Sequence, residues 1–170
     1  MISFMLISAP RCGSSWASNW LTTDATLCLH DPLYTRHYED LDSIISGKTL
    51  GIACTGIAHF HKWANQHSSR KVVLHRPLDE INLSLDAIGL PPIDVSYLDN
   101  LHRIEALHAD WTDLFDRPKP IYEHLTGLPF DAERHALLKE IEMQPNFATL
   151  KVGREVTARL VNEIRESVGA

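Results

Sequence analysis

A chain of 170 residues with 44% hydrophobic residues is long enough to bury one substantial core and too short for two independent ones. Its formal net charge of -6 disfavours a nucleic-acid-binding protein, which spreads an excess of Lys and Arg over one face. Three cysteines without a CxxC pair, no positively charged leader and no apolar run of about 20 residues predict a soluble, cytoplasmic protein without a membrane partner.

Four short apolar runs predict buried strands, and a helix-forming segment follows each of them. The strands are expected at residues 2–8, 26–29, 50–54 and 71–75. The helices are expected at residues 16–21, 40–46, 59–67 and 79–88. Such alternation predicts an α/β fold with a central parallel sheet flanked by helices, and we expect residues 1–170 to form a single domain.

The second half of the chain predicts mainly helices. The segment 96–115 has the pattern of an amphipathic helix and is the best candidate for a helical insertion on the substrate side. Its apolar side would consist of Leu98, Leu101, Ile104, Leu107 and Trp111. A short strand at 120–122, a helix at 131–143 capped by Asp131 and a C-terminal helix at 152–168 complete the prediction.

The loop at residues 10–16 carries the clearest chemical signal. A loop that follows a buried strand and opens a helix directs backbone N–H groups and the positive end of the helix dipole toward one point. Gly13 permits close approach to the backbone, and Ser14 and Ser15 add hydroxyl donors. Arg11 adds a permanent charge and a planar fork of donors. The loop therefore predicts a site for a phosphate or a sulfonate.

The same loop lacks the lysine of ATP-dependent P-loops. The sequence GxxxxGK[ST] places a Lys on the terminal phosphates and a hydroxyl on magnesium. No such Lys follows Gly13. A metal-dependent NTPase is therefore disfavoured, although an atypical P-loop kinase or phosphotransferase for small molecules remains an alternative.

Two motifs resemble those of the sulfotransferases that use PAPS (3′-phosphoadenosine 5′-phosphosulfate) as donor. The loop PRCGSSW at 10–16 is similar to the family's PKSGTTW or PRSGTTW, which follows its first strand. The stretch HRPLDEINLS at 75–84 is similar to its RxPxDxxxS, with Arg76 at a strand end and Ser84 eight residues later. At about 1.5 Å of rise per helical residue, both side chains can face one phosphate. PIYEHL at 120–125 also resembles the family's late YEDL segment.

This resemblance implies a P-loop NTPase-like three-layer fold, in a compact member of the kind found in bacteria and phages. PAPS would bind along the carboxyl edge of the sheet. Its 5′-phosphosulfate would be held by the loop residues Arg11, Cys12, Gly13, Ser14, Ser15 and Trp16. Arg76 and Ser84 would hold the 3′-phosphate. Arg11 stands where many members have a catalytic Lys, so it would stabilise developing charge without donating a proton. The acceptor would be a hydroxyl or amine of a small molecule or a glycan.

Transfer to a hydroxyl also needs a group that accepts the proton, usually an imidazole or a carboxylate. His30 and Asp31 follow the second predicted strand, where some branches of the family have an acidic base. Asp31 is the preferred base, with His30 as its neighbour. His59 and His61 follow the third predicted strand and are the alternative, because other branches use a His near that position.

The remaining histidines and cysteines predict no further cofactor. His59 and His61 lie two residues apart without partners at the spacing of structural zinc ligands, so no metal is expected. Cys12 lies near a predicted helix N-terminus, which would lower its pKa. A nucleotide-binding module without turnover is a third interpretation of the whole pattern, and the sequence leaves the oligomeric state open.

Overall fold

A parallel sheet of five strands forms the centre of the protein. The computed structural model describes residues 1–141. Its strands are β1 (Phe4–Ser8), β2 (Thr26–His30), β3 (Thr49–Cys54), β4 (Arg70–His75) and β5 (Leu107–Asp110). They lie in the order β2-β3-β1-β4-β5, and every neighbouring pair is parallel. The strands expected at residues 2–8, 26–29, 50–54 and 71–75 are confirmed, while β5 was not expected.

Burial on both faces explains why apolar runs form the central strands. Every residue of β1 is buried, and β3 and β4 are buried over most of their length. Successive side chains of a strand point to opposite faces. Accordingly, Phe4 and Leu6 join one cluster of core side chains, whereas Met5 and Ile7 join the other. A strand covered on both sides therefore has no polar positions to alternate with the apolar ones.

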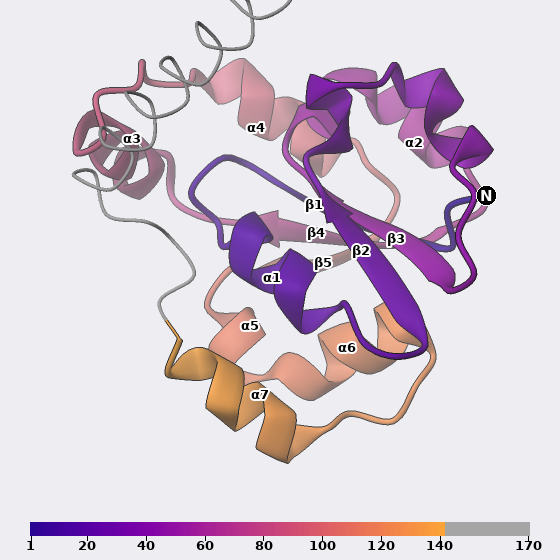
Figure 1. Ribbon diagram of the computed structural model, residues 1–170. Coiled ribbons are helices and arrows are strands. Elements are labelled where there is room, and N and C mark those ends of the chain that lie inside the picture. The colour runs from indigo at the N-terminus through magenta and orange to yellow at the C-terminus, as the bar shows by residue number, and fades with distance from the viewer. Residues whose placement is uncertain (142–170) are drawn as a thin grey trace, which may run out of the picture.

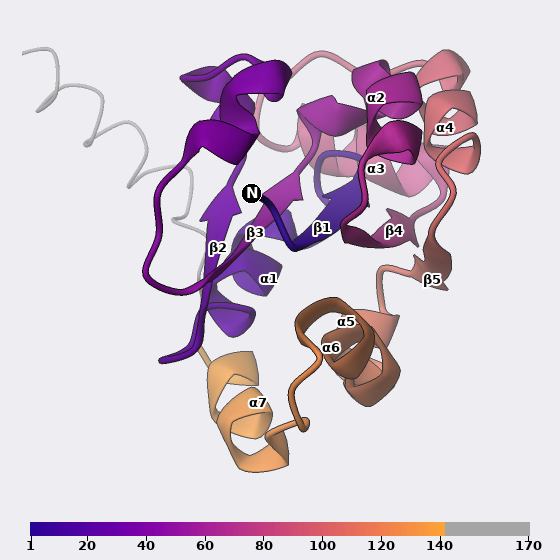
Figure 2. The same ribbon diagram turned by 90° about the vertical axis from the view of Figure 1, so that its right-hand side faces the viewer.

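Helices cover both faces of the sheet, which gives the three layers seen in Figures 1 and 2. One face is covered by α2 (His61–Gln66), α3 (Leu78–Asp86) and α4 (Val95–His102). The other face is covered by α1 (Ser14–Trp20), α5 (Asp113–Asp116), α6 (Pro118–Thr126) and α7 (Ala132–Lys139). Short 3-10 helices occupy Pro32–Tyr34, Tyr38–Ser43 and Gly56–Phe60. None of the helices in residues 1–141 has the length and apolar character to cross a membrane.

The segment 96–115, expected as one helix, forms three elements. It contains most of α4, all of β5 and most of α5. Leu101 and Ile104 are buried as expected, but Leu107 is 40% exposed. Without β5, strand β4 would present an unpaired edge of N–H and C=O groups, and the β4–β5 ladder satisfies them. Strand pairing therefore outweighs the helical spacing, and the prediction of a single helical insertion is wrong.

Other expected elements also differ in type or length. Residues 120–122, expected as a strand, lie inside α6, which has Pro118 in its first turn and ends at Gly127 with a φ of 71°. The segment expected as a helix at 40–46 is a 3-10 helix at Tyr38–Ser43. Asp131 caps α7 as expected, since its Oδ1 accepts from the Arg134 N–H at 2.9 Å. The helix expected at 152–168 lies outside the described residues.

The connections after β1 and β4 leave the sheet on opposite sides. The chain passes from β1 to α1 on one face and then to β2, whereas it passes from β4 to α3 on the other face and then toward β5. Because β1 and β4 are hydrogen-bonded neighbours, their following loops diverge from adjacent strand ends. Ligands of open parallel sheets bind at such a switch point. The loop at residues 10–13 and Arg76 both lie there.

Candidate functional site

The loop after β1 has an unusual backbone. Arg11 has a φ of 66° and Gly13 a φ of 81°, both in the left-handed region. Glycine adopts this region freely, but for Arg11 it costs about 1–2 kcal/mol. Strain of this kind persists where surrounding contacts hold it, and it often accompanies function. In this loop the N–H groups of Gly13, Ser14 and Ser15 donate to no other residue between 1 and 141.

The two motifs predicted from the sequence meet at this loop. Nε of Arg11 donates to Oγ of Ser84 on α3 at 2.9 Å, across 73 residues of sequence. Nη1 of Arg76 donates to the backbone carbonyl of Arg11 at 2.5 Å. The structure thus joins Arg11, Arg76 and Ser84 into one polar group at the carboxyl edge of the sheet.

Neighbouring side chains fix the guanidinium of Arg76. Its Nε donates to Oε2 of Glu80 at 3.1 Å, one helical turn away on α3. Its Cζ lies 4.4 Å from the centre of the Trp111 ring, which is a cation–π contact. The side chain is only 17% exposed. Together with the carbonyl of Arg11, three groups therefore orient Arg76, and it does not extend freely into solvent.

His30 connects the end of β2 with the loop. Its Nε2 lies 3.2 Å from Oγ of Ser14 and 3.1 Å from Oγ of Ser15. The same nitrogen lies 3.3 Å from Oδ2 of Asp31. The side chain of His30 is 37% exposed, whereas that of Asp31 is 9% exposed. One imidazole nitrogen thus lies beside two hydroxyls and a carboxylate, on a ring that is partly exposed.

Asp31 is held in place by the end of β3. Its Oδ1 accepts from the N–H of Thr55 at 2.6 Å and from the Thr55 hydroxyl at 3.0 Å. The buried hydroxyl of Tyr97 in turn donates to the Thr55 carbonyl. Burial above all raises the pKa of Tyr97, so this hydroxyl keeps its proton and remains a donor. The φ of Asp31 is 42°, so its backbone is also strained. Only its Oδ2 faces His30.

A cavity of about 390 Å³ lies beside these groups. Its polar wall includes Arg11, Ser14, Ser15, His30 and Asp31, and its apolar wall consists of Leu85, Ile88, Leu90, Pro91 and Ile93. The volume is within the range of about 300–1,000 Å³ typical of small-molecule sites. Two adjoining cavities, of about 210 and 400 Å³, share Thr55 and His59. Arg76 and Ser84 lie outside this wall and contact it through Arg11.

The side chains of Cys12 and Trp16 face the core rather than the cavity. Sγ of Cys12 donates to the Pro10 carbonyl at 3.7 Å, and Nε1 of Trp16 donates to the Leu138 carbonyl at 3.1 Å. Only their backbone groups are therefore placed to meet a ligand. Burial raises the pKa of Cys12 to about 12, against the opposing charge of Arg76. The expectation of a lowered pKa for this thiol is wrong, because desolvation outweighs the position at a helix start.

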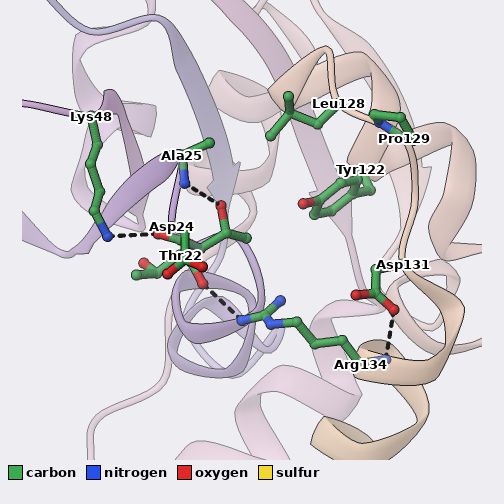
Figure 3. Close-up of a pocket in the computed structure, with 10 residues that line it drawn as sticks. Thr22, Asp24, Ala25, Lys48, Tyr122, Leu128, Pro129, Asp131 and Arg134 are labelled. Atoms are coloured by element: carbon green, nitrogen blue, oxygen red, sulfur yellow. Dashed lines mark hydrogen bonds between the residues drawn. The ribbon is translucent and has the colours of Figure 1, made fainter.

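A larger cavity, of about 700 Å³, lies at the opposite edge of the sheet (Figure 3). The loop before β2 and the start of α7 line it, and its two positively charged side chains already donate hydrogen bonds to backbone carbonyls. Arg134 donates to the carbonyls of Asn19, Trp20 and Thr22, and Lys48 donates to that of Thr23. Arg134 thereby satisfies carbonyls at the end of α1. Arg134 and Lys48 thus have structural roles in this cavity.

Of the two histidines that the sequence offered as alternative bases, His59 lies near the site, and His61 does not line its cavities. His59 borders the adjoining cavities and lies edge-on to Tyr97. His61 has a buried Nδ1 without a hydrogen bond to any residue from 1 to 141. Sequence reasoning missed Thr55 and Tyr97, which position Asp31, because the role of Thr55 depends on the strand order and that of Tyr97 on the packing of α4. It also missed a group of three histidines, His75, His102 and His108, which come together from three separate elements.

The residues of the site indicate which chemistry it can support. No family model matches the chain, and neither a curated protein nor a solved structure matches it. Two guanidinium groups and a loop with unused N–H groups suit an anion with several oxygens. An accessible imidazole beside a carboxylate suits the movement of a proton. A ligand that carries an anionic group and a reacting hydroxyl fits both halves.

Proposed function

We propose that this protein is a PAPS-dependent sulfotransferase of the P-loop type. The observation that supports it best is the contact between Arg11 and Ser84, at 2.9 Å. In the family that the sequence resembles, the two motifs bind the two ends of one donor, so they must lie within the length of one molecule. The parallel sheet and the position of both motifs at its switch point agree with the same proposal.

Donor binding relies on a few local cations, because the chain as a whole has a net charge of -6. Arg76 and the hydroxyl of Ser84 bind the 3′-phosphate. The loop N–H groups and Arg11 bind the 5′-phosphosulfate. Nε of Arg11 donates to Ser84, but the two terminal nitrogens of Arg11 make no hydrogen bond within residues 1–141 and can bind the ligand. Each charge-assisted hydrogen bond contributes about 1.5–3 kcal/mol.

The transfer step moves the sulfonate to an acceptor in the cavity. The acceptor oxygen or nitrogen attacks sulfur in line, and the bond from sulfur to the bridging phosphate oxygen breaks. PAP, the desulfonated donor, leaves with that electron pair while Arg11 stabilises the developing charge. The acceptor proton passes to Nε2 of His30, whose side chain lines the cavity close to the loop hydroxyls. Once Nε2 holds the proton it can donate to Oδ2 of the buried Asp31, so we assign the base to His30 and charge stabilisation to Asp31.

Calorimetric titration of the full chain with PAP, and separately with ATP and magnesium, tests donor choice. We expect PAP to bind with a Kd in the micromolar range or below, and ATP with magnesium to bind at least about tenfold more weakly, because the loop lacks a P-loop lysine. The reverse order would replace the proposal with a phosphotransferase. Absence of binding by both nucleotides would overturn it altogether.

His30→Gln is expected to separate binding from turnover. The slow transfer of sulfonate from PAPS to water, followed as release of PAP, should fall roughly 100-fold or more, as for loss of a general base. The affinity for PAP should change less than about threefold, since His30 contacts no donor phosphate in this scheme. His37→Gln is a matched control, because His37 is exposed and pairs with Glu39 away from the loop. Equal turnover in both variants would exclude His30 as the base.

A further inference from the structure

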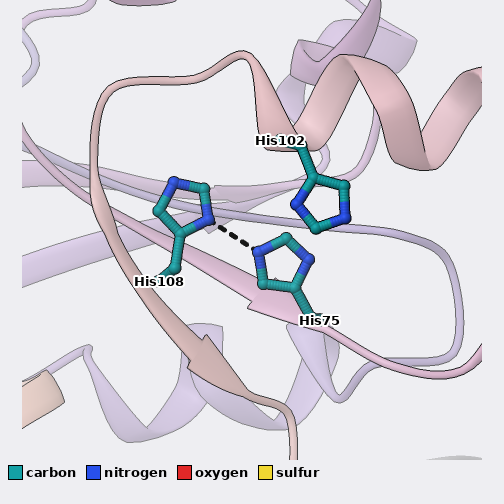
Figure 4. A group of neighbouring side chains, drawn as sticks. All are labelled: His75, His102 and His108. Atoms are coloured by element: carbon teal, nitrogen blue, oxygen red, sulfur yellow. Dashed lines mark hydrogen bonds between the residues drawn. The ribbon is translucent and has the colours of Figure 1, made fainter.

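Three histidines gather at the carboxyl end of β4, away from the cavity (Figure 4). His75 is the last residue of β4, His102 is the last residue of α4, and His108 lies on β5. A nitrogen from each ring lies within 4.8 Å of a nitrogen from both others. His102 and His108 are exposed and His75 is half-buried, so the group is open to solvent.

The rings already form one connected set. Nε2 of His75 and Nδ1 of His108 lie 2.7 Å apart and share a hydrogen bond. The His75 ring lies between the others and nearly parallel to both, with its centroid 4.5 Å from that of His102 and 4.9 Å from that of His108. Three side chains that can each offer one ring nitrogen to a metal thus lie around one point.

The tautomer of His108 follows from its second contact. Its Nε2 lies 2.9 Å from the carbonyl oxygen of Ile104, which can only accept a hydrogen bond. Nε2 therefore carries the proton, and Nδ1 directs its lone pair toward His75. Histidine ligands of metals are oriented by a backbone carbonyl or carboxylate in the same manner. Ile104 is buried in the core, so this carbonyl is a fixed support.

We propose that His75, His102 and His108 together bind one transition-metal dication of the zinc type. Imidazole nitrogen is a preferred ligand of Zn²⁺ and Ni²⁺. Zn–N bonds of about 2.0–2.1 Å in a tetrahedral site place the nitrogens about 3.3 Å apart. His75 and His108 must move slightly apart and the near-parallel rings must turn inward, which the two exposed side chains can do. Water completes the coordination, because the group faces solvent.

Because Nδ1 of His108 is the acceptor in the hydrogen bond between the two rings, Nε2 of His75 carries the shared proton. On binding, the proton of the His75–His108 hydrogen bond moves from Nε2 to the other ring nitrogen, and both facing lone pairs become available to the ion.

Calorimetric titration of the chelator-treated full chain with ZnCl₂ near pH 7.5 tests this site. We expect one equivalent of Zn²⁺ to bind with a Kd in the micromolar range or below and to raise the Tm, whereas Mg²⁺ does neither. His102→Gln and His108→Gln should each weaken binding by about tenfold or more. His37→Gln, an exposed histidine outside the group, serves as the matched control and should bind like the unsubstituted chain.

The ring nitrogens give a second, direct measurement. In nitrogen NMR spectra, Zn²⁺ should shift the signals of the three histidines and leave that of His37 in place. Absence of a stoichiometric site, or a site that survives His102→Gln with His108→Gln, would overturn the proposal. The PAP titration tests the sulfotransferase proposal separately, so either can fail without the other.

Discussion

Arg76→Ala is expected to weaken PAP binding by roughly 30- to 1,000-fold, which is about 2–4 kcal/mol. The substitution removes the charged fork that would face the 3′-phosphate in the proposed donor complex. It also removes the hydrogen bond that Nη1 donates to the Arg11 carbonyl at 2.5 Å, which holds the loop in its left-handed conformation. Both losses act on the donor site, so calorimetry with PAP should register a large effect. Arg76→Lys should recover only part of the affinity, because an ammonium retains the charge but not the planar fork.

Arg103→Ala is the matched control for this experiment. Arg103 is exposed at the end of α4, so its substitution removes one positive charge, as Arg76→Ala does, without affecting the loop. A loss of affinity equal to that of Arg76→Ala would show that net charge alone governs binding, and the 3′-phosphate role would fail. Circular dichroism and the Tm check the fold, since Arg76→Ala also removes the contact with Trp111, worth about 1 kcal/mol.

The candidate site was partly predictable because both of its motifs lie at the ends of predicted strands. The carboxyl ends of parallel strands meet at one edge, so Arg11 and Arg76 were expected near each other, and the structure places them in contact. The order of the strands in the sheet was not predictable. Thr55 contacts Asp31 only because β3 lies beside β2 in the sheet. The sequence alone had therefore no means to separate the roles of Asp31 and His30.

The sheet was predictable in its centre and not at its edge. β1 is apolar from Phe4 to Ile7 and β4 from Val72 to Leu74, since helices cover both faces of the sheet, and such runs are recognisable locally. β5 is mostly exposed and its sequence LHAD has no strand pattern. It forms a strand because β4 offers an unpaired ladder, which is a tertiary cause. The same reason hid the histidine group, because β5 brings His108 beside His75.

Gly51→Ala is expected to destabilise the protein by about 3 kcal/mol and to lower the Tm by roughly 10 °C. Gly51 lies on β3 directly beside Phe4 of β1 in the ladder. A Cβ at this position would lie 2.0 Å from Cε2 of Phe4 and 2.1 Å from its Cζ. The Phe4 ring is fully buried in the cluster that contains Trp20, Leu74 and Leu125, so it has little room to move. Thermal or denaturant unfolding measures the effect.

Gly47→Ala makes the same chemical change where no atom lies within 4 Å of the added Cβ. It should leave stability unchanged or raise it by a few tenths of a kcal/mol, because alanine restricts the unfolded chain. A double-mutant cycle with Phe4→Leu isolates the cause. If the ring occupies the space that the methyl group needs, Gly51→Ala should cost clearly less in the Phe4→Leu background than alone. Strict additivity would mean that the backbone of β3, and not the Phe4 ring, requires glycine at position 51.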